Sequence, residues 1–461
     1  MNVFVIYHRK KLTTLSKWRK QKLRQEPGER PPCQPLCYAF RMMKEYDVLV
    51  AGGGPSGFIA AVAAARNGAR TALIEKNGFL GGLATSGLVS PISEFRKNGR
   101  LIVKGIPWEF IKRLEAAGGA VTDYPNGNIP FDSELYKLTA ARMVAEEGID
   151  CYLSSTLTGC EVKDSQIGSV QISGLSGTYS LSASRYIDCT GDAMLSLHAG
   201  LEMQEENETQ PASLCFRIGN VDLAKLDNAE LREEGTKYAN REIRSTLESL
   251  RAEGVDVPLF GGPWFQRDVR PGAVYANITR SAVCPDDPLE TSKVEAKLRE
   301  DAYCLFRLLK EHVPAFRESQ LIETAAHIGY RQSRRIKGKH ILTGSEILSG
   351  LPFEDTVAFT AHPVDIHLPG SSGQSVRFLD RPGAIPYRSL YSEAIGNLLV
   401  AGRCISADKE AIASARVQAP SMALGQAAGT AAALSFKEGR GVEDLDTGRL
   451  RDTLLSQKAV V

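Results

Sequence analysis

The sequence predicts an α/β fold in which a Rossmann-type domain, a three-layer parallel sheet with a β-meander, carries an inserted α+β domain. Residues 47–51 form a short apolar strand that runs directly into a glycine cluster, and residues 60–66 have the composition of a small-residue helix. Residues 71–74 form the next strand and complete a βαβ unit of about 30 residues. Residues 397–402 and 420–434 repeat this order of buried strand and small-residue helix near the end of the chain.

After the first βαβ unit, the sequence pattern predicts a helix and then several strands that rejoin the sheet. Asp132 is expected to cap a helix that runs to about Glu147, and residues 151–154 to form a strand. Residues 157–187 are interpreted as the meander, with short strands broken at Gly168, Gly174 and Gly177.

The middle of the chain, from about residue 205 to 320, is more charged and helix-rich. Its clearest helical spacing joins Val294, Leu298, Leu305 and Leu308. We therefore expect a cap or substrate domain inserted into a discontinuous nucleotide-binding domain. The expected bounds are 44–210 and 325–440 for the nucleotide-binding domain, 211–324 for the cap, and 441–461 for a C-terminal helical tail.

Charge is unevenly distributed along the 461 residues, whose formal net charge is +2. Residues 1–43 hold ten Lys or Arg against two acids, which leaves the remainder with 46 basic and 52 acidic residues. Residues 1–43 are expected to be a disordered basic extension, either a targeting arm or, as we favour, sequence upstream of a true start at Met42 or Met43. The acidic body argues against nucleic acid as a partner.

Cysteine spacing and hydropathy argue against a metalloprotein, a membrane-spanning protein and a secreted protein. The nine cysteines are scattered and odd in number, with no C-x-x-C pair, so we interpret them as reduced thiols without a metal or iron–sulphur centre. No run reaches the roughly 20 apolar residues that span a bilayer, and the apolar opening is too short for a signal peptide. The expected compartment is the cytoplasm.

The glycine cluster Gly52-Gly53-Gly54-Pro55-Ser56-Gly57 fits G-x-G-x-x-G between a strand and a helix, the context in which this motif binds a dinucleotide. Of the three motif glycines, the first allows a tight turn and the second lets backbone amides approach a pyrophosphate. The third lets the helix pack closely on the strand. Glu75 ends the second strand, where an acid accepts hydrogen bonds from a ribose diol. A structural tight turn is the alternative, but the strand, helix and acid together favour the nucleotide.

Two further segments select FAD over NAD by resemblance. Residues 75–87, with Gly81-Gly82 and Thr85, resemble the segment that follows the Rossmann motif in the glutathione-reductase-type FAD superfamily. Residues 186–192 resemble its second fingerprint, and the chain from about Tyr46 to Leu434 resembles the FAD-dependent oxidoreductase family related to the flavoprotein part of heterodisulfide reductase. This resemblance implies non-covalent FAD, with Gly402 near the ribityl chain and the amides of Ser421 and Met422 facing the flavin O2 atom. The residues expected at the cofactor are Gly52, Gly53, Gly54, Pro55, Ser56, Gly57, Glu75, Lys76, Gly82, Thr85, Gly191, Asp192, Gly402, Ser421 and Met422.

Candidate catalytic residues cluster in one segment. His327, Arg331, Arg334 and Arg335 would share one face of a helix, and arginine suits carboxylate or phosphate recognition. A solvated basic face, or pairing with acids such as Glu323, is the alternative.

Two histidines and two other residues complete the candidates. His362 and His367 flank Asp365 and titrate near neutral pH, so either could move a proton, and His367 is preferred. Cys404 is interpreted as a small buried hydrophobe in preference to a redox thiol, and Arg416 as a contact to flavin, to substrate or to backbone carbonyls. The expected catalytic set is His327, Arg331, Arg335 and His367.

The function predicted is an FAD-dependent oxidoreductase that transfers a hydride between flavin N5 and a small, anionic organic substrate. The alternatives are a monooxygenase or NAD(P)H-fed reductase, and a flavoprotein without turnover, acting as an electron-relay component or an RNA-modifying scaffold. The expected partner is a small molecule, with an electron-transfer protein as a further candidate.

Overall fold

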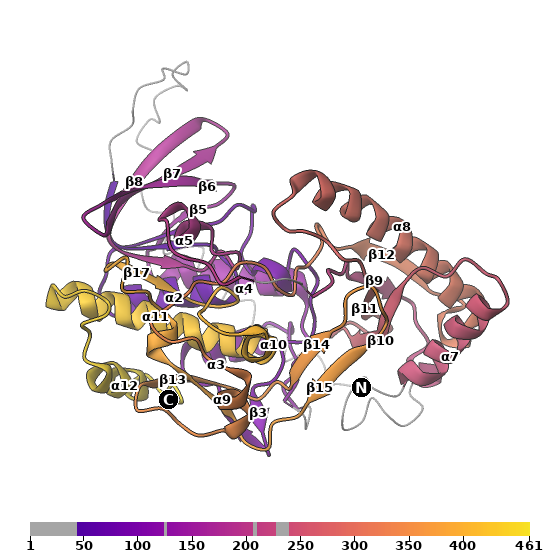
Figure 1. The fold of residues 1–461 in the computed structure, drawn as a ribbon. Coiled ribbons are helices and arrows are strands. Elements are labelled where there is room, and N and C mark those ends of the chain that lie inside the picture. The colour runs from indigo at the N-terminus through magenta and orange to yellow at the C-terminus, as the bar shows by residue number, and fades with distance from the viewer. Residues whose placement is uncertain (1–43, 124–126, 206–209, 227–238) are drawn as a thin grey trace, which may run out of the picture. The chain divides into compact units, whose positions relative to one another are not determined.

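A seven-stranded mixed sheet carries the fold in the computed structural model, which describes residues 44–123, 127–205, 210–226 and 239–461 (Figure 1). The predicted basic extension, residues 1–43, lies outside the described residues. The sheet order is β5-β2-β1-β8-β7-β6, and β17 also pairs with β8. Its strands are β1 (Lys44–Ala51), β2 (Thr71–Ile74), β5 (Asp150–Tyr152), β6 (Thr156–Lys163), β7 (Gln166–Gly174), β8 (Gly177–Asp188) and β17 (Leu398–Val400).

Strand β8 joins the meander to the parallel part of the sheet. Residues 178–182 of β8 pair antiparallel with β7, and residues 186–188 pair parallel with β17. The predicted break at Gly168 is wrong, because this glycine lies inside β7. The breaks at Gly174, where β7 ends, and at Gly177, where β8 begins, are confirmed. The β6–β7 turn instead falls at Asp164 and Ser165, whose φ angles are +48° and +56°. The predicted Rossmann-type α/β fold is confirmed, with a mixed sheet instead of a purely parallel one.

Two helices, α2 (Pro55–Arg66) and α11 (Gln418–Glu438), pack against each other beside this sheet. Their approach requires glycine: a Cβ on Gly425 would lie 2.1 Å from the carbonyl oxygen of Ser56, and one on Gly429 would lie 2.1 Å from that of Ala60. The two small-residue helices predicted from the sequence are therefore neighbours in space, although they lie near opposite ends of the described chain.

The remaining helices of this part surround the two central ones. Asp132 caps α4 as predicted, accepting hydrogen bonds from the amides of Glu134 and Leu135. The helices are α3 (Ile106–Ala116), α4 (Ser133–Glu146), α5 (Met194–His198), α9 (Gly344–Ser349), α10 (Lys409–Ala415) and α12 (Thr447–Ser456), with short 3₁₀ turns at Gly82–Ala84, Pro314–Phe316 and Tyr387–Ser389.

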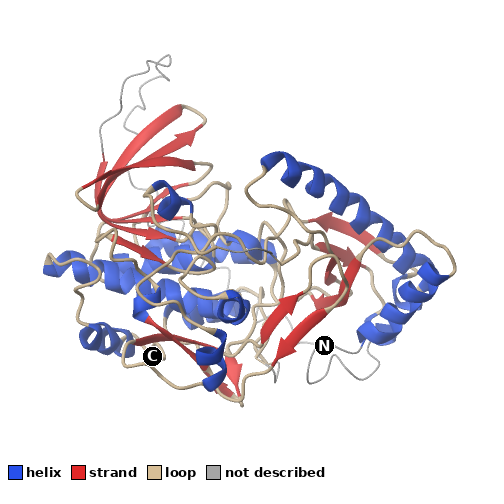
Figure 2. Cartoon of the chain, viewed as in Figure 1, coloured by secondary structure: helices blue, strands red, loops and turns tan. Residues whose placement is uncertain are grey.

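The inserted region contains an antiparallel sheet as well as helices (Figure 2). The helical spacing of Val294, Leu298, Leu305 and Leu308 lies in one long helix, and these side chains belong to a hydrophobic cluster drawn from residues 212–328 and Leu88. This separate core supports the predicted α+β insertion, whose bounds 211–324 stay a prediction. The sheet order is β10-β11-β9-β12, and the elements are β9 (Phe216–Gly219), β10 (Phe260–Arg267), β11 (Val274–Thr279), β12 (Gln320–Thr324), α6 (Leu223–Leu226), α7 (Ala239–Ala252) and α8 (Pro288–His312).

Three two-stranded sheets complete the fold. The pair β14 (Val364–His367) and β15 (Gln374–Arg377) lies beside α10 and reaches toward the inserted sheet in Figure 1. The others join β13 (Thr356–Thr360) with β16 (Gly383–Pro386), and β3 (Arg96–Lys97) with β4 (Arg100–Leu101). Among the described residues, no helix combines the length and apolar character needed to cross a bilayer.

Candidate active site

The glycine cluster has the geometry that the motif predicts. Gly52 has a φ of +96°, and a Cβ there would lie 2.4 Å from the carbonyl oxygen of Cys189. A Cβ on Gly57 would lie 1.7 Å from the carbonyl oxygen of Gly52, so only glycine allows α2 to start against β1. Gly52, Gly54, Pro55 and Ser56 line a cavity of about 740 Å³, whereas Gly53 and Gly57 lie behind its wall.

The start of α2 fits a dinucleotide phosphate. Gly54 is the N-cap and offers no side-chain acceptor, so no side chain competes for the first amides of the helix. Gly54 and Gly82 approach each other closely: a Cβ on Gly82 would lie 2.9 Å from the Cα of Gly54. Gly82 and Lys76 also line the cavity.

Glu75 is held at the end of β2 with 5% of its surface exposed. Its Oε2 accepts a hydrogen bond from the amide of Gly53 at 2.7 Å, and its Oε1 one from the amide of Asn77 at 2.8 Å. The carboxylate is thus fixed at the cavity wall, where a ribose is expected. Thr85 does not line the cavity; its hydroxyl donates to the carbonyls of Leu80 and Gly82 and shapes the loop.

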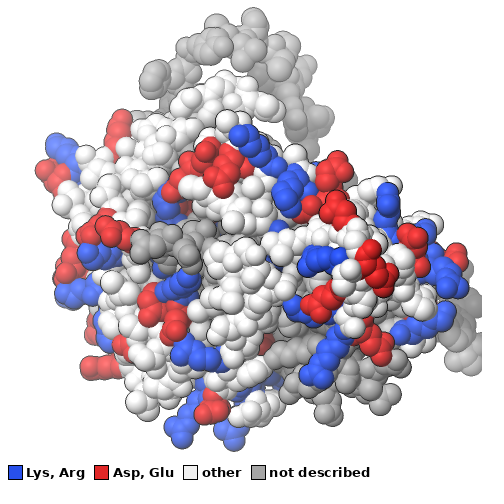
Figure 3. Space-filling view, turned by 45° about the vertical axis from the view of Figure 1, so that its right-hand side comes forward, with Lys and Arg blue, Asp and Glu red and all other residues white. Residues whose placement is uncertain are grey.

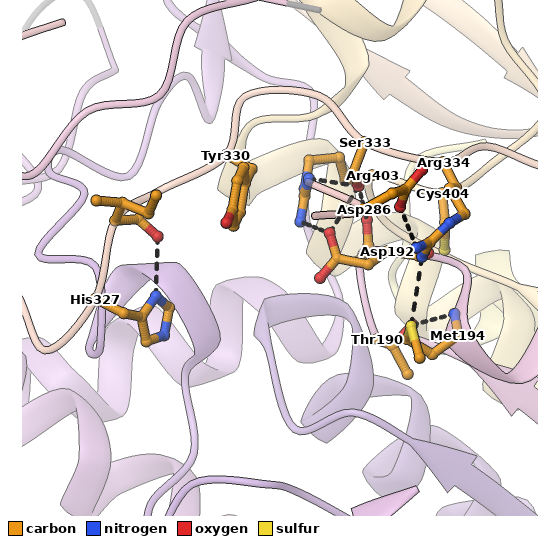
Figure 4. A network of polar contacts seen from close by, with 12 residues as sticks. Thr190, Asp192, Met194, Asp286, His327, Tyr330, Ser333, Arg334, Arg403 and Cys404 are labelled. Atoms are coloured by element: carbon orange, nitrogen blue, oxygen red, sulfur yellow. Dashed lines mark hydrogen bonds and ion pairs between the residues drawn. The ribbon is translucent and has the colours of Figure 1, made fainter. Parts of the chain in front are cut away.

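The second fingerprint forms a polar corner after β8. Gly191 and Asp192 line the cavity, and Asp192 Oδ1 lies 2.7 Å from Arg403 Nη2 and 2.6 Å from the Ser333 hydroxyl (Figure 4). Burial alone would raise the pKa of Asp192, but the charge of Arg403 and the Ser333 hydrogen bond lower it overall. Gly402, with a φ of +93°, lies at the cavity beside the Ser56 hydroxyl.

The start of α11 differs from the prediction. The helix begins at Gln418, not Pro420, and the Ser421 amide donates to the carbonyl of Val417 at 3.1 Å. Ser421 therefore lines the cavity but has no free amide, and Met422 is fully buried away from it. The predicted donors are wrong because the first turn of the helix lies earlier, at Gln418, which also lines the cavity.

The segment that carries His327 and Arg331 is not a helix. Residues 325–343 contain only bridges and turns, and Gly329 pairs antiparallel with Ser213 of the inserted region. His327 and Arg331 nevertheless both line the cavity, from a segment of bends and isolated bridges instead of the predicted helix face.

Arg334 and Arg335 do not share this face. The Arg335 Nε donates to the carbonyl of Ala407 at 2.7 Å, and the residue is buried outside the cavity lining. Arg334 pairs with Asp286 at the surface. Arg335 therefore has a structural position, and its predicted catalytic role is not compatible with this location.

A chain of hydrogen bonds crosses the cavity wall from the inserted region to β14 and α10. The Ser213 hydroxyl accepts from Arg331 Nη1 at 3.0 Å and from Arg280 Nη1 at 2.7 Å, and Arg280 Nη2 lies 3.0 Å from His367 Nδ1. We call this chain the arginine network. Its members are Arg331, Ser213, Arg280, His367, Asp365 and Arg416.

The second half of the arginine network lies at the end of β14. His367 Nε2 is 3.2 Å from Asp365 Oδ2, and Arg416 Nη2 donates to the backbone carbonyl of Asp365 at 3.0 Å. Arg331, His367, Asp365 and Arg416 all line the cavity, while Arg280 is 2% exposed and lies behind them.

Burial dominates the electrostatics of this network. It lowers the pKa of each of the three guanidinium groups, and the charge of Arg331 lowers that of Arg280 and Arg416 further. Burial and the charge of Arg331 also lower the pKa of His367 to about 3. The pKa of Asp365 is lowered despite its burial, because His367 and Arg416 stabilise the carboxylate.

The two candidate histidines have different surroundings. Both nitrogens of His367 are engaged, by Arg280 and by Asp365, and its low pKa keeps it neutral near pH 7, which contradicts the predicted proton transfer. His327 Nδ1 lies 2.9 Å from the carbonyl oxygen of Ile328, which fixes a proton on that nitrogen. Its Nε2 is buried and has no hydrogen-bond partner in the described structure. Of the two, only His327 has a nitrogen available to accept a proton. Figure 4 shows its other ring nitrogen bonded to a carbonyl oxygen.

Several site residues were missed by sequence reasoning. Arg280 follows β11, Ser213 precedes β9, and Arg403 follows β17, so no motif or spacing connects them. Asp365 was noticed only as a neighbour of the two histidines. Arg416 was a candidate, and the predicted bond to a backbone carbonyl is confirmed at Asp365. A charged residue directly after a strand end was the sole signal for Arg280, and it is too common to be selective.

Fold and site together are typical of a dinucleotide-binding protein: a glycine-rich turn between β1 and α2, an acid at the end of β2, and a cavity lined by arginines. The sequence model of the FAD dependent oxidoreductase family matches residues 47–454. The chain therefore belongs to this family, and its cofactor is FAD.

Individual relatives match more narrowly. A dihydrolipoyl dehydrogenase of Acholeplasma laidlawii is 40% identical over 60 residues, which cover 13% of this chain and 18% of that protein. A digeranylgeranylglycerophospholipid reductase of Methanococcus vannielii is 29% identical over 203 residues, 41% of this chain and 49% of that protein. The chain thus spans less than a fifth of the first relative and about half of the second. A geranylgeranyl bacteriochlorophyll reductase-like structure from Thermoplasma acidophilum has 17% identity and a TM-score of 0.45, with 91% of this chain and 85% of that chain covered.

Proposed function

We propose that this FAD-dependent oxidoreductase transfers a hydride between FAD and a small organic anion held by Arg331 and Arg416. The observation that supports this most is that no carboxylate among the described residues bonds to the guanidinium groups of Arg280, Arg331 or Arg416. Their partners are carbonyls, a hydroxyl, an amide oxygen and an imidazole. Buried charges are normally paired, so an anionic ligand is the expected counterpart.

Different residues at the cavity would bind the substrate and transfer its proton. FAD, when bound, supplies two-electron chemistry at the N5 atom of its ring. Arg331 and Arg416 would orient the anionic group of the substrate, and His327 Nε2 would accept or return the substrate proton. Trp264, Phe265 and Tyr330 line the same cavity and would exclude water from the apolar part of the substrate.

The test is anaerobic reduction of the full-length FAD-loaded protein by a panel of hydroxy and amino carboxylates, followed as loss of the visible flavin band. Bleaching by a carboxylate, and its loss in Arg331→Gln, is the expected result. Arg251→Gln is the matched control, because Arg251 donates to the carbonyls of Val257 and Pro258 and does not line the cavity.

The alternative functions give different results in the same experiment. Bleaching by NADPH alone, with no response to any carboxylate, would favour the monooxygenase or NAD(P)H-fed reductase. Reduction only by a reduced ferredoxin-type protein would favour the electron relay. Either result would contradict the proposed substrate class.

A further inference from the structure

We infer that the substrate carries two carboxylates, one bound by Arg331 and the other by Arg416. This inference rests on the proposed function and narrows its substrate class from an anion to a dicarboxylate. It depends on three features of the arginine network: its charge, its contrast with other buried arginines, and the separation of its two ends.

The charge count of the network exceeds that of one monoanion. Arg280, Arg331 and Arg416 contribute three positive charges, Asp365 contributes one negative charge, and His367 is neutral. Two positive charges therefore have no counterpart inside the network. The other cavity acids nearby are engaged elsewhere: Asp192 pairs with Arg403, and Glu94 lies 3.8 Å from His362.

Two other arginines with little exposed surface are paired with carboxylates. Arg217, with 7% of its side chain exposed, lies 3.3 Å from Asp268 and 2.8 Å from Glu323. Arg403, with 12% exposed, lies 2.7 Å from Asp192. At the cavity, Arg331 and Arg416 bond to neutral groups of the described chain instead, which supports an anionic ligand as their partner.

The two cavity-facing guanidinium groups reach the cavity from different segments of the chain. Arg331 belongs to the segment paired with the inserted region, whereas Arg416 follows α10 beside β14. Four residues, Ser213, Arg280, His367 and Asp365, connect them through hydrogen bonds. Arg416 Nη1 is buried without a partner in the described structure, so this end of the network has a free donor of its own. Separate positive groups suit two carboxylates on one carbon chain better than a single phosphate.

Asp365 between the two ends adds a constraint on the middle of the substrate. Its Oδ2 is bonded to His367, while its Oδ1 has no partner in the described structure. A third anionic group placed there would be repelled. A dicarboxylate with a neutral centre is therefore preferred over a tricarboxylate.

The test compares acids of equal chain length on the full-length FAD-loaded protein. Malonate, succinate and glutarate are titrated against propionate, butyrate and pentanoate, and binding is followed by the change in the visible flavin spectrum and by calorimetry. At least one dicarboxylate should bind about tenfold tighter than its monocarboxylate partner, which corresponds to about 1.4 kcal/mol for the second ion pair. Inorganic phosphate, the single-site dianion, should bind no tighter than the monocarboxylate.

Substitutions then assign the two ends. Arg331→Gln and Arg416→Gln should each reduce dicarboxylate affinity to the level of the monocarboxylate, while Arg331→Lys and Arg416→Lys should retain part of the preference. Arg251→Gln should behave as wild type. Released FAD and the melting temperature show that each variant is folded, and the lysine variants carry the test if a glutamine variant is not.

The outcomes separate this inference from the proposed function. Equal affinity for every mono- and dicarboxylate pair would overturn the dicarboxylate and leave the anionic substrate standing. Phosphate binding tighter than any dicarboxylate would overturn the two-site arrangement. Failure of all six carboxylates to bind would overturn both proposals.

Discussion

Arg217 and Arg331 are both arginines held inside the protein, but their surroundings are opposite. Arg217 lies on β9 between two carboxylates, Asp268 at 3.3 Å and Glu323 at 2.8 Å. Arg331 bonds only neutral oxygens, of Pro211, Ser213 and Asn277, and lines the cavity. A buried charge that pairs with a carboxylate of the same chain contributes to the stability of the fold. A buried charge whose partner is a ligand costs stability in the free protein and contributes to binding.

The outer surface reinforces this contrast. On the face shown in Figure 3, basic and acidic side chains are interspersed, with no broad field of one sign. The arginine network, by contrast, brings positive charges together at the cavity wall.

Arg217→Met should destabilise the protein by about 3–5 kcal/mol, because it leaves Asp268, whose side chain is fully buried, without its cation. Urea denaturation measures the effect. Arg449→Met is the control: Arg449 is 58% exposed and pairs with Glu438, so its loss should cost less than about 1 kcal/mol. Equal losses in the two variants would show that burial of the pair has no special role.

The unfolding free energy should fall by about 1 kcal/mol per pH unit between pH 6.5 and 4.5 because of His367. Its pKa is about 3 in the folded protein and 6.5 in the unfolded chain, so only the unfolded chain binds this proton in that range. The stabilisation is fully present above pH 6.5 and is lost as the pH falls toward 3.

Denaturation of His367→Gln at both pH values measures this contribution. Glutamine can still accept from Arg280 and donate to Asp365, but it does not titrate. The pH slope should therefore become shallower by the His367 contribution, and an unchanged slope would assign the acid sensitivity to other groups.

Arg331→Gln should change the unfolding free energy of the ligand-free protein by no more than about 1 kcal/mol, and in the stabilising direction. The substitution removes repulsion from Arg280, with which Arg331 shares the Ser213 hydroxyl. A loss as large as that of Arg217→Met would show that Arg331 is a structural residue and would remove the main support for an anion site.

Salt should give the smallest effect. At about 1 M sodium chloride, where the Debye length is about 3 Å, wild type should gain a few tenths of a kcal/mol relative to Arg331→Gln, since anions reach the network through the cavity. Matched urea curves at low and high salt measure the difference. An identical response of both proteins would indicate that the network is closed to ions.

Much of the cofactor site could be predicted from the sequence because its residues lie close together along the chain. Gly52 to Gly57 and Glu75 lie within one βαβ unit, and their roles follow from glycine sterics and from the position of an acid at a strand end. Thr85 and Met422 were placed too close to the cofactor, and Ser421 lines the cavity without the free amide expected of it. The start of a helix and the turn of a loop depend on neighbours that the motif does not include.

The substrate side was predicted less well because it is assembled from distant segments. His327 and Arg331 were expected together on a helix, and they do share the cavity, but from an irregular segment in which Gly329 pairs with Ser213. Arg335 lies outside the cavity lining because its guanidinium group is buried against the carbonyl of Ala407.

From the sequence alone, the chain was predicted to have a dinucleotide-binding α/β fold and to belong with flavin-dependent oxidoreductases. The phosphate-binding turn is predictable because short-range steric demands of glycine, strand and helix specify it. Only the tertiary structure decided which charges meet. Arg280, His367 and Arg416 lie on three separate segments, and electrostatic energy depends on distances in space that spacing along the chain does not encode.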